Sequence, residues 1–223
     1  MRRQRRASQD YRDFMLSTNP VAYWRLGEAS GSVARDEMGV NHGTYVGSPL
    51  LGVAGLLSGD PNTAATFDGT TQYVSGTVPE TGSNFTVAAW GRTISTAIAD
   101  LISRRAANPN VAFDLILVPP SIRLYIGDGT QSASVSTTLS DNDGAQHLWV
   151  GTFNGSLMRI YRDGVLANSA TLSIVPSAIG ASFYIGNDSY GRRWPGTIDE
   201  PAVWNRDITP AEIAELYRIG MGR

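Results

Sequence analysis

Residues 183–220 read FYIGNDSYGRRWPGTIDEPAVWNRDITPAEIAELYRIG, and this stretch decides the fold that the rest of the chain completes. In order it contains a short apolar strand, a glycine-rich loop, a second strand and a helix. Thr209, Pro210 and Glu212 predict where the helix starts, because Thr-x-x-Glu is a capping box and proline is favoured at the first helical position. The stretch therefore predicts two strands closed by one capped helix.

The faces of these elements follow from their periods. Side chains alternate along a strand, so Ile198, Ala202 and Trp204 are expected on one face of the second strand and Asp199 on the other. Pro201 inside this strand indicates an edge or a bulge. The helix is expected to end at Gly220 and to turn one apolar face toward the body, made of Ile213, Leu216 and Tyr217.

The chain before this stretch reads as β-structure. From residue 64 to residue 172, short apolar runs alternate with Asp-Gly, Asn-Gly and proline turn signals, a pattern typical of an all-β sandwich or barrel. VAYWRL, residues 21–26, predicts an earlier strand. A short helix is expected over residues 10–17, with Phe14 and Leu16 as its apolar anchors.

Composition narrows the class of protein. The 223 residues are 42% hydrophobic and 17% charged, which fits one globular domain with a sizeable core. Cysteine is absent, so the chain has no disulfide framework and no thiolate metal site. No apolar run has the length of a signal peptide or a membrane span, so a membrane partner is not expected.

Charge divides the chain into an arm and a body. All 18 basic residues are arginine, and residues 1–13 carry five of them against two aspartates, whereas the remainder is mildly acidic. We therefore expect a basic N-terminal arm, residues 1–19, and a sandwich domain, residues 20–223. An acidic body argues against sequence-specific nucleic-acid binding. The arm is suited to docking on an acidic neighbour, through Arg2, Arg3, Arg5, Arg6, Tyr11 and Phe14.

Seven short motifs along residues 20–220 give more specific information about the fold than the hydrophobic periodicity does. They are PVAYWRLGE (20–28), Asp36 to Gly43 followed by Thr44-Tyr45, ATFDG (65–69) with Tyr73-Val74, FTVAAW (85–90), His147 leading into Trp149, YRDG (161–164), and GTIDE (196–200) with VWNR (203–206). Together they resemble the laminin-G-like modules of the concanavalin A-like jelly-roll superfamily. The resemblance implies an antiparallel β-sandwich with one short C-terminal helix.

The opening motif is similar to laminin-G-like proteins encoded by tailed phages and actinobacteria. That resemblance implies a non-enzymatic virion structural protein, with a capsid accessory or decoration protein favoured over a tail protein. It would attach through its N-terminal arm to the major capsid protein or another virion protein at the particle surface, with self-association as a further expectation. Fold alone does not fix this function.

The sequence predicts no catalytic arrangement. Glucanases of this fold place carboxylates at alternate strand positions, about 5–5.5 Å apart, for a retaining mechanism. Asp199 and Glu200 are adjacent, so their side chains diverge. A Ser-His-Asp hydrolase would have to use His42 or His147, and no Gly-x-Ser-x-Gly elbow is present. His147 is interpreted as a structural hydrogen-bonding residue, and we expect no enzyme activity.

Calcium is the one cofactor that the resemblance implies. Family members often bind one ion between an aspartate of the early loop and the closing strand, and the matching positions are Asp36, Asn41 and Asp199, with Glu200 a weaker candidate. Oxygen ligands of this kind suit a hard cation. The alternative is that Asp36 and Asn41 form Asx-turns and that Asp199 bonds to a loop backbone.

Sugar binding would use exposed aromatic side chains beside polar groups. Tyr190 and Trp194 are the candidates, since glycines and Pro195 keep their loop out of regular strand and two arginines, Arg192 and Arg193, lie between them. The alternative places Trp194 over the edge of the sandwich. A calcium-assisted carbohydrate-binding or host-adhesion module, on a tail or as a secreted lectin-like protein, is accordingly the second function considered.

Overall fold

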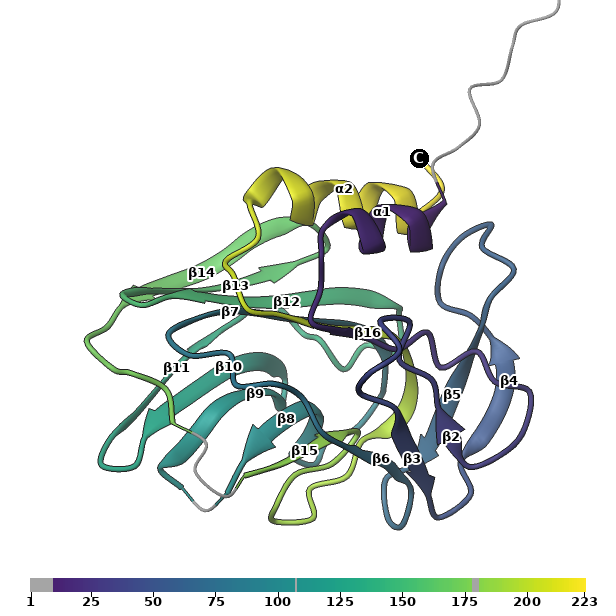
Figure 1. Cartoon of the computed structure of the whole chain (residues 1–223), viewed down its shortest axis with the longest axis horizontal. Helices are drawn as coiled ribbons and strands as arrows, with labels where there is room; N and C mark the ends of the chain where they lie inside the picture. Colours follow the sequence, from purple (N-terminus) through teal and green to yellow (C-terminus); the bar gives the residue numbers. More distant parts are fainter. Residues whose placement is uncertain (1–9, 107, 178–180) are drawn as a thin grey trace, which may run out of the picture.

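The computed structural model describes residues 10–106, 108–177 and 181–223 as two antiparallel sheets with two helices lying over one of them (Figure 1). The first sheet is the one beneath the helices. Its strands, in spatial order, are β14 (Val165–Thr171), β13 (Leu157–Arg162), β12 (His147–Asn154), β7 (Asn84–Arg92), β16 (Pro195–Trp204), β5 (Thr63–Asp68) and β4 (Leu50–Ala54), with β1 (Ala22–Tyr23) pairing β16.

The second sheet faces away from the helices. Its strands, in spatial order, are β11 (Ser132–Ser136), β10 (Ser121–Asp128), β9 (Asn110–Val118), β8 (Ala99–Arg105), β15 (Ser182–Ile185), β6 (Tyr73–Gly76), β3 (Gly43–Val46) and β2 (Val33–Ala34). The antiparallel all-β sandwich expected from the sequence is confirmed. The predicted strand at residues 21–26 is shorter than expected, because only β1 and a bridge from Trp24 to Asp36 pair there.

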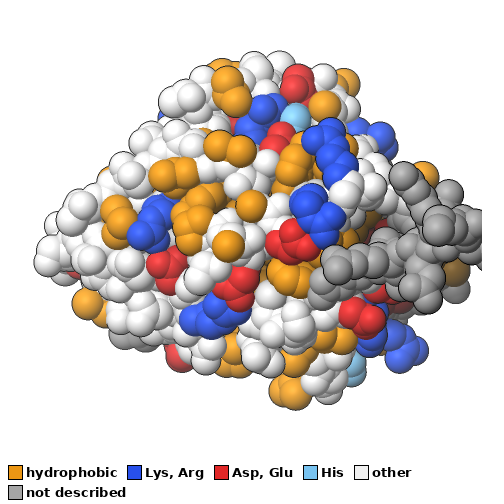
Figure 2. Space-filling view, turned by 90° about the horizontal axis from the view of Figure 1, so that it is seen from above, with side chains coloured by type: hydrophobic (Ala, Val, Ile, Leu, Met, Phe, Trp, Pro, Cys, Tyr) orange, Lys and Arg blue, Asp and Glu red, His pale blue; other side chains and the backbone are white. Residues whose placement is uncertain are grey.

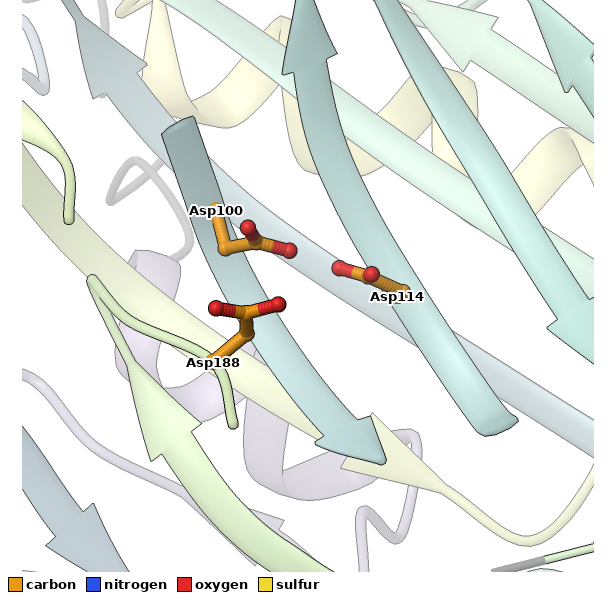
Figure 3. Close-up of side chains that lie close together, drawn as sticks. All are labelled: Asp100, Asp114 and Asp188. Atoms are coloured by element: carbon orange, nitrogen blue, oxygen red, sulfur yellow. The ribbon is translucent and has the colours of Figure 1, made fainter. Parts of the chain in front are cut away.

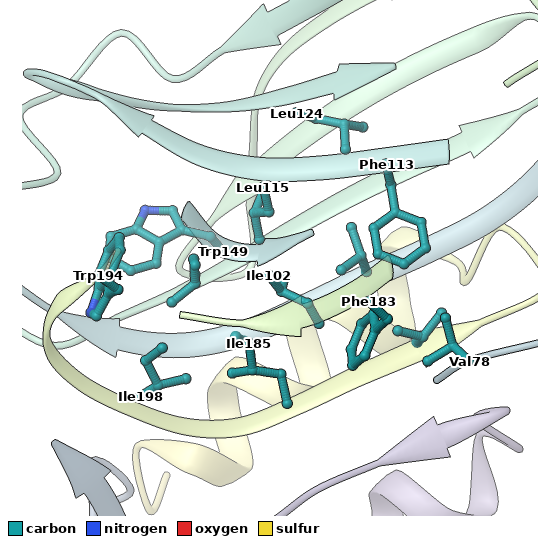
Figure 4. Packing of buried hydrophobic residues seen from close by; sticks show 14 of the residues in the cluster. Val78, Ile102, Phe113, Leu115, Leu124, Trp149, Phe183, Ile185, Trp194 and Ile198 are labelled. Carbon is teal, nitrogen blue, oxygen red and sulfur yellow. The ribbon is translucent and has the colours of Figure 1, made fainter. Parts of the chain in front are cut away.

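The main core fills the space between the sheets (Figure 4). Each contributing strand alternates, so Phe113 and Leu115 of β9 and Leu124 of β10 point inward from the second sheet while Trp149 of β12 meets them from the first. Aromatic rings pack against one another here, with Trp24 stacked on Phe183 at 5.1 Å between centroids. Burial of this apolar surface is the dominant stabilising term.

A second core lies between the first sheet and the helices α1 (Tyr11–Ser17) and α2 (Pro210–Gly220). Tyr11 and Met15 of α1 are buried in it. The Tyr11 hydroxyl accepts a hydrogen bond from Trp90 Nε1 at 3.0 Å, and the Thr18 hydroxyl accepts one from Trp204 Nε1 at 3.0 Å. The short helix expected at residues 10–17 is present, but residue 19 does not divide two structural units, because α1 is part of the body.

The closing strand β16 departs from the predicted alternation. Ile198 faces the main core, whereas Ala202 and Trp204 face the helices. The reason is a bulge between Asp199 and Ala202, where Glu200 adopts a left-handed backbone with φ of 54°. One extra residue reverses the side on which every later side chain lies. The expectation that these three apolar residues share a face was therefore wrong, although the bulge expected at Pro201 is there.

Helix α2 begins as its sequence predicts. Thr209 and Glu212 form both hydrogen bonds of the capping box, and Pro210 is the first helical residue. Gly220 still belongs to the helix and does not end it in a left-handed turn; a Cβ at this position would lie 2.4 Å from Trp90 Cζ2, so glycine is required for close packing. Over the described residues, neither helix has the length and apolarity needed to span a membrane.

Candidate functional site

The residues expected to hold calcium serve as backbone acceptors. The two carboxylate oxygens of Asp36 accept hydrogen bonds from four backbone N–H groups, those of Tyr23, Met38, Val40 and Asn41, at 2.8–3.1 Å. Asp199 accepts one from the Leu56 N–H at 2.8 Å. Donors therefore point at both oxygens of Asp36 and at Oδ2 of Asp199, while Oδ1 of Asp199 is buried without a hydrogen-bond partner among the described residues. These residues do not fit a calcium site as they stand, and the Asx-turn alternative describes their geometry.

Asp199 and Glu200 are adjacent buried acids in the bulge of β16. Glu200 is buried, accepts hydrogen bonds from Arg25 Nε at 2.9 Å and from the Tyr23 hydroxyl, and its ion pair with Arg25 extends to Asp60. Burial raises the pKa of Glu200 to about 7, against the opposing effect of Arg25. Both acids are 1% exposed. At this exposure, neither carboxylate is open to solvent.

The outer face of the second sheet carries a continuous row of polar and aromatic side chains. Strand pairing places these residues side by side across seven strands, in the order Thr44, Ser75, Tyr184, Ser103, Asp114, Tyr125 and Ser134. Their sequence neighbours, such as Val74, Phe183 and Leu124, face the main core. Tyr73, also on this face, packs edge-on against Tyr184 with ring centroids 5.6 Å apart.

Loop 186–194, which joins β15 to β16, folds back over the outer face of β8. Four hydrogen bonds of 2.6–3.0 Å fix the loop to β8 and to Ala106 just beyond it. They run from Gly186 N to Leu101 O, from Ser103 Oγ to Asn187 O, from Ser189 Oγ to Ala106 O, and from Asp100 N to Arg192 O. Inside the loop, Asp188 accepts from the N–H groups of Tyr190 and Arg192. The loop is thus a fixed platform on the sheet.

Beneath the loop, the carboxylates of Asp100, Asp114 and Asp188 converge from β8, β9 and the loop (Figure 3). The Arg192 guanidinium lies 2.6 Å from Asp188 and 3.3 Å from Asp114, and Arg105 pairs with Asp114. Asp100 Oδ2 lies 2.9 Å from Arg192 Nε without hydrogen-bond geometry, and neither oxygen of Asp100 has a hydrogen-bond partner. Burial, reinforced by Asp114, raises the pKa of the Asp100 carboxyl.

The three aspartates are the described acidic group whose spacing could hold a metal ion. Two guanidinium groups, those of Arg105 and Arg192, already pair with these carboxylates where a cation would bind. The cluster is therefore an ion-pair network that binds the loop to the sheet. Burial of all three side chains keeps them away from any substrate.

Tyr190 stands at the outer surface of this platform. Its side chain is 55% exposed, and the guanidinium carbons of Arg105 and Arg192 lie 4.9 Å and 5.4 Å from its ring centroid. Its hydroxyl accepts a hydrogen bond from the Asn108 N–H at 2.8 Å. An aromatic ring held in place by cations and by its hydroxyl, with one side in solvent, is the kind of surface on which a sugar ring packs.

Trp194, the other aromatic candidate, is not available to a ligand. It is fully buried in the main core and packs edge-on against Trp149 with centroids 6.0 Å apart (Figure 4). Its backbone N–H donates to Gly186 O at 3.0 Å, which closes the loop and directs the indole inward. The prediction that Trp194 binds carbohydrate was wrong, and its packing alternative describes the structure.

Two predicted docking residues belong to the second core instead. Tyr11 is 3% exposed, so it cannot present its ring to a partner while α1 is folded. Phe14 is half-buried and packs against the same core. Arg2, Arg3, Arg5 and Arg6 lie outside the described residues. On the helical side, acidic and basic side chains are interspersed, without a large patch of one sign over the described part of that face (Figure 2).

A cavity of about 490 Å³ opens on the same helical side, between the start of α1, the end of α2 and the loop at residues 57–61. Its lining mixes Asp10 and Asp60 with Arg218 and Arg223. The one aromatic residue that lines it, Tyr11, is buried. The tyrosine-bearing face of the second sheet is the better candidate for a ligand.

Sequence reasoning missed Tyr73, Tyr125 and Tyr184, the partly exposed tyrosines around Tyr190. Tyr125 and Tyr184 each lie between two inward-facing apolar residues, as in Leu124-Tyr125-Ile126, and this alternation could have marked them as outward-facing. Tyr73 has an apolar neighbour on one side only, because Gln72 precedes it. What the sequence did not show is that strands β6, β15 and β10 belong to one sheet.

Comparison with known proteins gives the family and the fold. A family model for the concanavalin A-like lectin/glucanases superfamily, Laminin_G_3, matches residues 68–214. One similar solved structure is domain 4 of AbnA, a GH43 extracellular arabinanase from Geobacillus stearothermophilus, in complex with arabinotriose. Its sequence is 20% identical to this chain and its TM-score is 0.67. The match covers 89% of this chain and 98% of the arabinanase domain.

Two further solved structures are similar at lower identity. The binding domain of Paraclostridial Mosquitocidal Protein 1 has a TM-score of 0.73 and 13% identity, covering 91% of this chain and 52% of that chain. Trypanosoma rangeli sialidase has a TM-score of 0.65 and 17% identity, covering 90% and 32%. The chain thus spans about half of the toxin chain. No curated protein matches the chain.

Proposed function

Because the chain belongs to the concanavalin A-like lectin/glucanases superfamily, we propose that it is a non-enzymatic glycan-binding protein whose binding face is the outer face of the second sheet. The observation that carries the proposal is Tyr190, exposed on a loop that hydrogen bonds and ion pairs fix to the sheet. A rigid aromatic ring surrounded by polar groups is suited to packing against a sugar.

The similar structures support this proposal by analogy. The arabinanase domain was solved with arabinotriose, and the toxin structure is described as a binding domain. At 20% and 13% identity they share the fold, and fold alone does not carry function. The proposal therefore depends on the site around Tyr190.

The buried positions of the candidate carboxylates are the reason that we propose binding without catalysis. Asp100, Asp114 and Asp188 are buried and neutralised by arginines, while Asp199 and Glu200 are buried under α1. A glycosidase needs two carboxyl groups that reach the scissile bond. Calcium assistance, which the sequence led us to expect, is not part of the proposal, because backbone donors occupy the oxygens of Asp36. Binding measured with and without EDTA tests this, and we expect no difference.

The experiment is glycan binding by the full chain on an array that includes bacterial surface polysaccharides. We expect Tyr190→Ala to abolish binding, because it removes the ring, and Tyr190→Phe to retain most of it, because only the hydroxyl is lost. Leu50→Ala, which removes an exposed apolar side chain on the first sheet, is the control. The same affinity in Tyr190→Ala and wild type would contradict the proposal.

A second candidate is the virion role, a capsid decoration protein on the particle surface that docks on major capsid or other virion proteins or self-associates. The observation that bears on it is that α1 is anchored in the second core, so the attachment role passes to Arg2, Arg3, Arg5 and Arg6. Mass spectrometry of purified phage particles, with wild type and with residues 1–9 deleted, is the test. Equal occupancy of the particle by the two proteins would exclude attachment through these arginines.

A further inference from the structure

Arginines on the described part of the chain fall into two groups. Most lie within 4.0 Å of a carboxylate. On the outer face of the second sheet and its covering loop, Arg123 and Arg193 have no such partner among the described residues. Arg192 and Arg193 make the contrast sharpest, because they are adjacent and Arg192 pairs with three aspartates.

Arg193 is held in place without its charge being neutralised. Its guanidinium carbon lies 5.3 Å from the ring centroid of Tyr73, and that ring in turn packs against Tyr184. Among the described residues its one side-chain hydrogen bond runs from Nη1 to the Gly191 carbonyl at 3.3 Å. Its Nε is buried and therefore closed to a ligand. The Nη groups of this stacked guanidinium, which no described carboxylate pairs with, are the donors that an anion would meet.

Arg193 and Tyr190 belong to the same fixed loop, with Gly191 and Arg192 between them. A Cβ at Gly191 would lie 3.2 Å from Arg193 Nη1, so the guanidinium lies against the backbone next to Tyr190. A ring that packs on Tyr190 and a charge that pairs with Arg193 can therefore belong to one ligand residue or to two neighbouring ones.

We infer that the glycan bound at this face is acidic: a carboxylate or sulfate group of the sugar pairs with Arg193 while a sugar ring packs on Tyr190. This inference rests on the proposed function and names its ligand class. Arg123 of β10 provides a second unpaired guanidinium on the same face. It lies four strands from Tyr73 of β6, roughly 19 Å at the usual strand spacing, so a chain of several acidic sugars would reach both.

The test compares acidic and neutral oligosaccharides by isothermal titration calorimetry with the full chain. The acidic series contains galacturonate oligomers, sialyllactose and sulfated dextran oligomers, and the neutral series contains arabino- and gluco-oligosaccharides. We expect at least tenfold tighter binding of an acidic ligand than of its neutral counterpart. The carboxylate and sulfate ligands distinguish the two sources of negative charge.

Two variants test whether the guanidinium of Arg193 is the group that binds the acidic ligand. Arg193→Ala is expected to weaken acidic binding tenfold or more and to leave any neutral binding unchanged. Arg35→Ala is the matched control, because Arg35 is an exposed arginine that pairs with no described carboxylate and directly follows β2, the edge strand of the same sheet. Thermal melts of both variants establish that the fold is intact.

Three results would overturn the inference. Equal losses in Arg193→Ala and Arg35→Ala would show attraction to net charge only. Tyr190-dependent binding of neutral sugars, with no preference for acidic ones, would reject the acidic ligand class and leave the proposed function standing. Absence of binding to either series and to the polysaccharide array would overturn both proposals.

Discussion

Glu200 shows how one residue in an unusual backbone conformation controls its surroundings. It lies in the β16 bulge with φ of 54°, fully buried, and receives hydrogen bonds from Arg25 and Tyr23. Burial raises its pKa from 4.5 to about 7, and burial together with Glu200 raises the pKa of Asp199 as well. The folded protein therefore binds protons at this site that the unfolded chain releases.

This pKa predicts a pH dependence of stability. Since the folded-state pKa lies above the unfolded value, the free energy of unfolding should fall as pH rises from about 4.5 to about 7. Glu200→Gln removes this contribution and should flatten the profile by up to about 3 kcal/mol between pH 5 and pH 8. Urea unfolding of both proteins at several pH values measures it.

Glu215→Gln is the control for this series. Glu215 pairs with Arg218 on the surface of α2, which lowers its pKa, so its contribution changes below the pH range of the measurement. Parallel stability profiles for wild type and Glu200→Gln would contradict the pKa assignment.

For single residues, the sequence predicted which residue types matter better than it predicted where their side chains point. Tyr190 and Trp194 occur four residues apart in one glycine-rich loop, and one proved exposed and the other buried. The difference arises from bonds to distant strands, such as Gly186 N to Leu101 O, which no local pattern encodes. The side-chain directions after Glu200 were missed for a similar reason, because Pro201 signals a bulge without fixing the number of residues in it.

Helix α1 shows the same lesson for an element. Its existence and extent followed from residues 10–17, and Asp10 caps it as its side chain accepts from Arg12 N. The way in which α1 packs on the body could not be predicted from the sequence. A helix of seven residues has too few apolar positions to show which face is buried. Met15, which was not among the expected anchors, is 1% exposed.

The attachment of α1 predicts where the N-terminus tolerates truncation. Deleting residues 1–9 should leave the unfolding free energy nearly unchanged, because the deletion keeps Tyr11 and Met15, which anchor α1 in the second core. Met15→Ala should cost about 2–5 kcal/mol through the cavity it creates. Asp13→Ala, at an exposed position of the same helix, should change stability by about 0.5 kcal/mol or less. Guanidinium unfolding of the three proteins distinguishes these cases, and an unaffected Met15→Ala would show that α1 is dispensable.

For the whole molecule, the three layers leave one broad sheet face uncovered by helices. The helices cover the first sheet, and both α1 and the C-terminal end of α2 lie on that side (Figure 1). Motifs along residues 20–220 were sufficient to predict the sandwich. They could not predict that Tyr73, Tyr125 and Tyr184 share a face, because the strand order β10-β9-β8-β15-β6 joins segments more than 100 residues apart.

This layering predicts an orientation effect on binding. The chain has no cysteine, so one introduced cysteine gives a unique attachment point. Coupling to a maleimide support through Ala214→Cys, exposed on α2, should preserve glycan binding, whereas coupling through Ser134→Cys, exposed on β11 of the second sheet, should abolish it. Both variants should bind equally in solution. Equal capacity of the two supports would place the binding face elsewhere.

The hydrogen bonds and ion pairs that fix loop 186–194 to the sheet also reduce the entropy lost on binding. A loop that becomes ordered only when its ligand arrives loses conformational entropy at that moment, about 0.5–1.5 kcal/mol for each immobilised side chain. Here Arg105 and Arg192 hold Tyr190, and Tyr73 holds Arg193, so this entropy is already lost during folding. A shallow contact with one or two sugar rings can then yield a measurable affinity, with a small entropic penalty in the calorimeter.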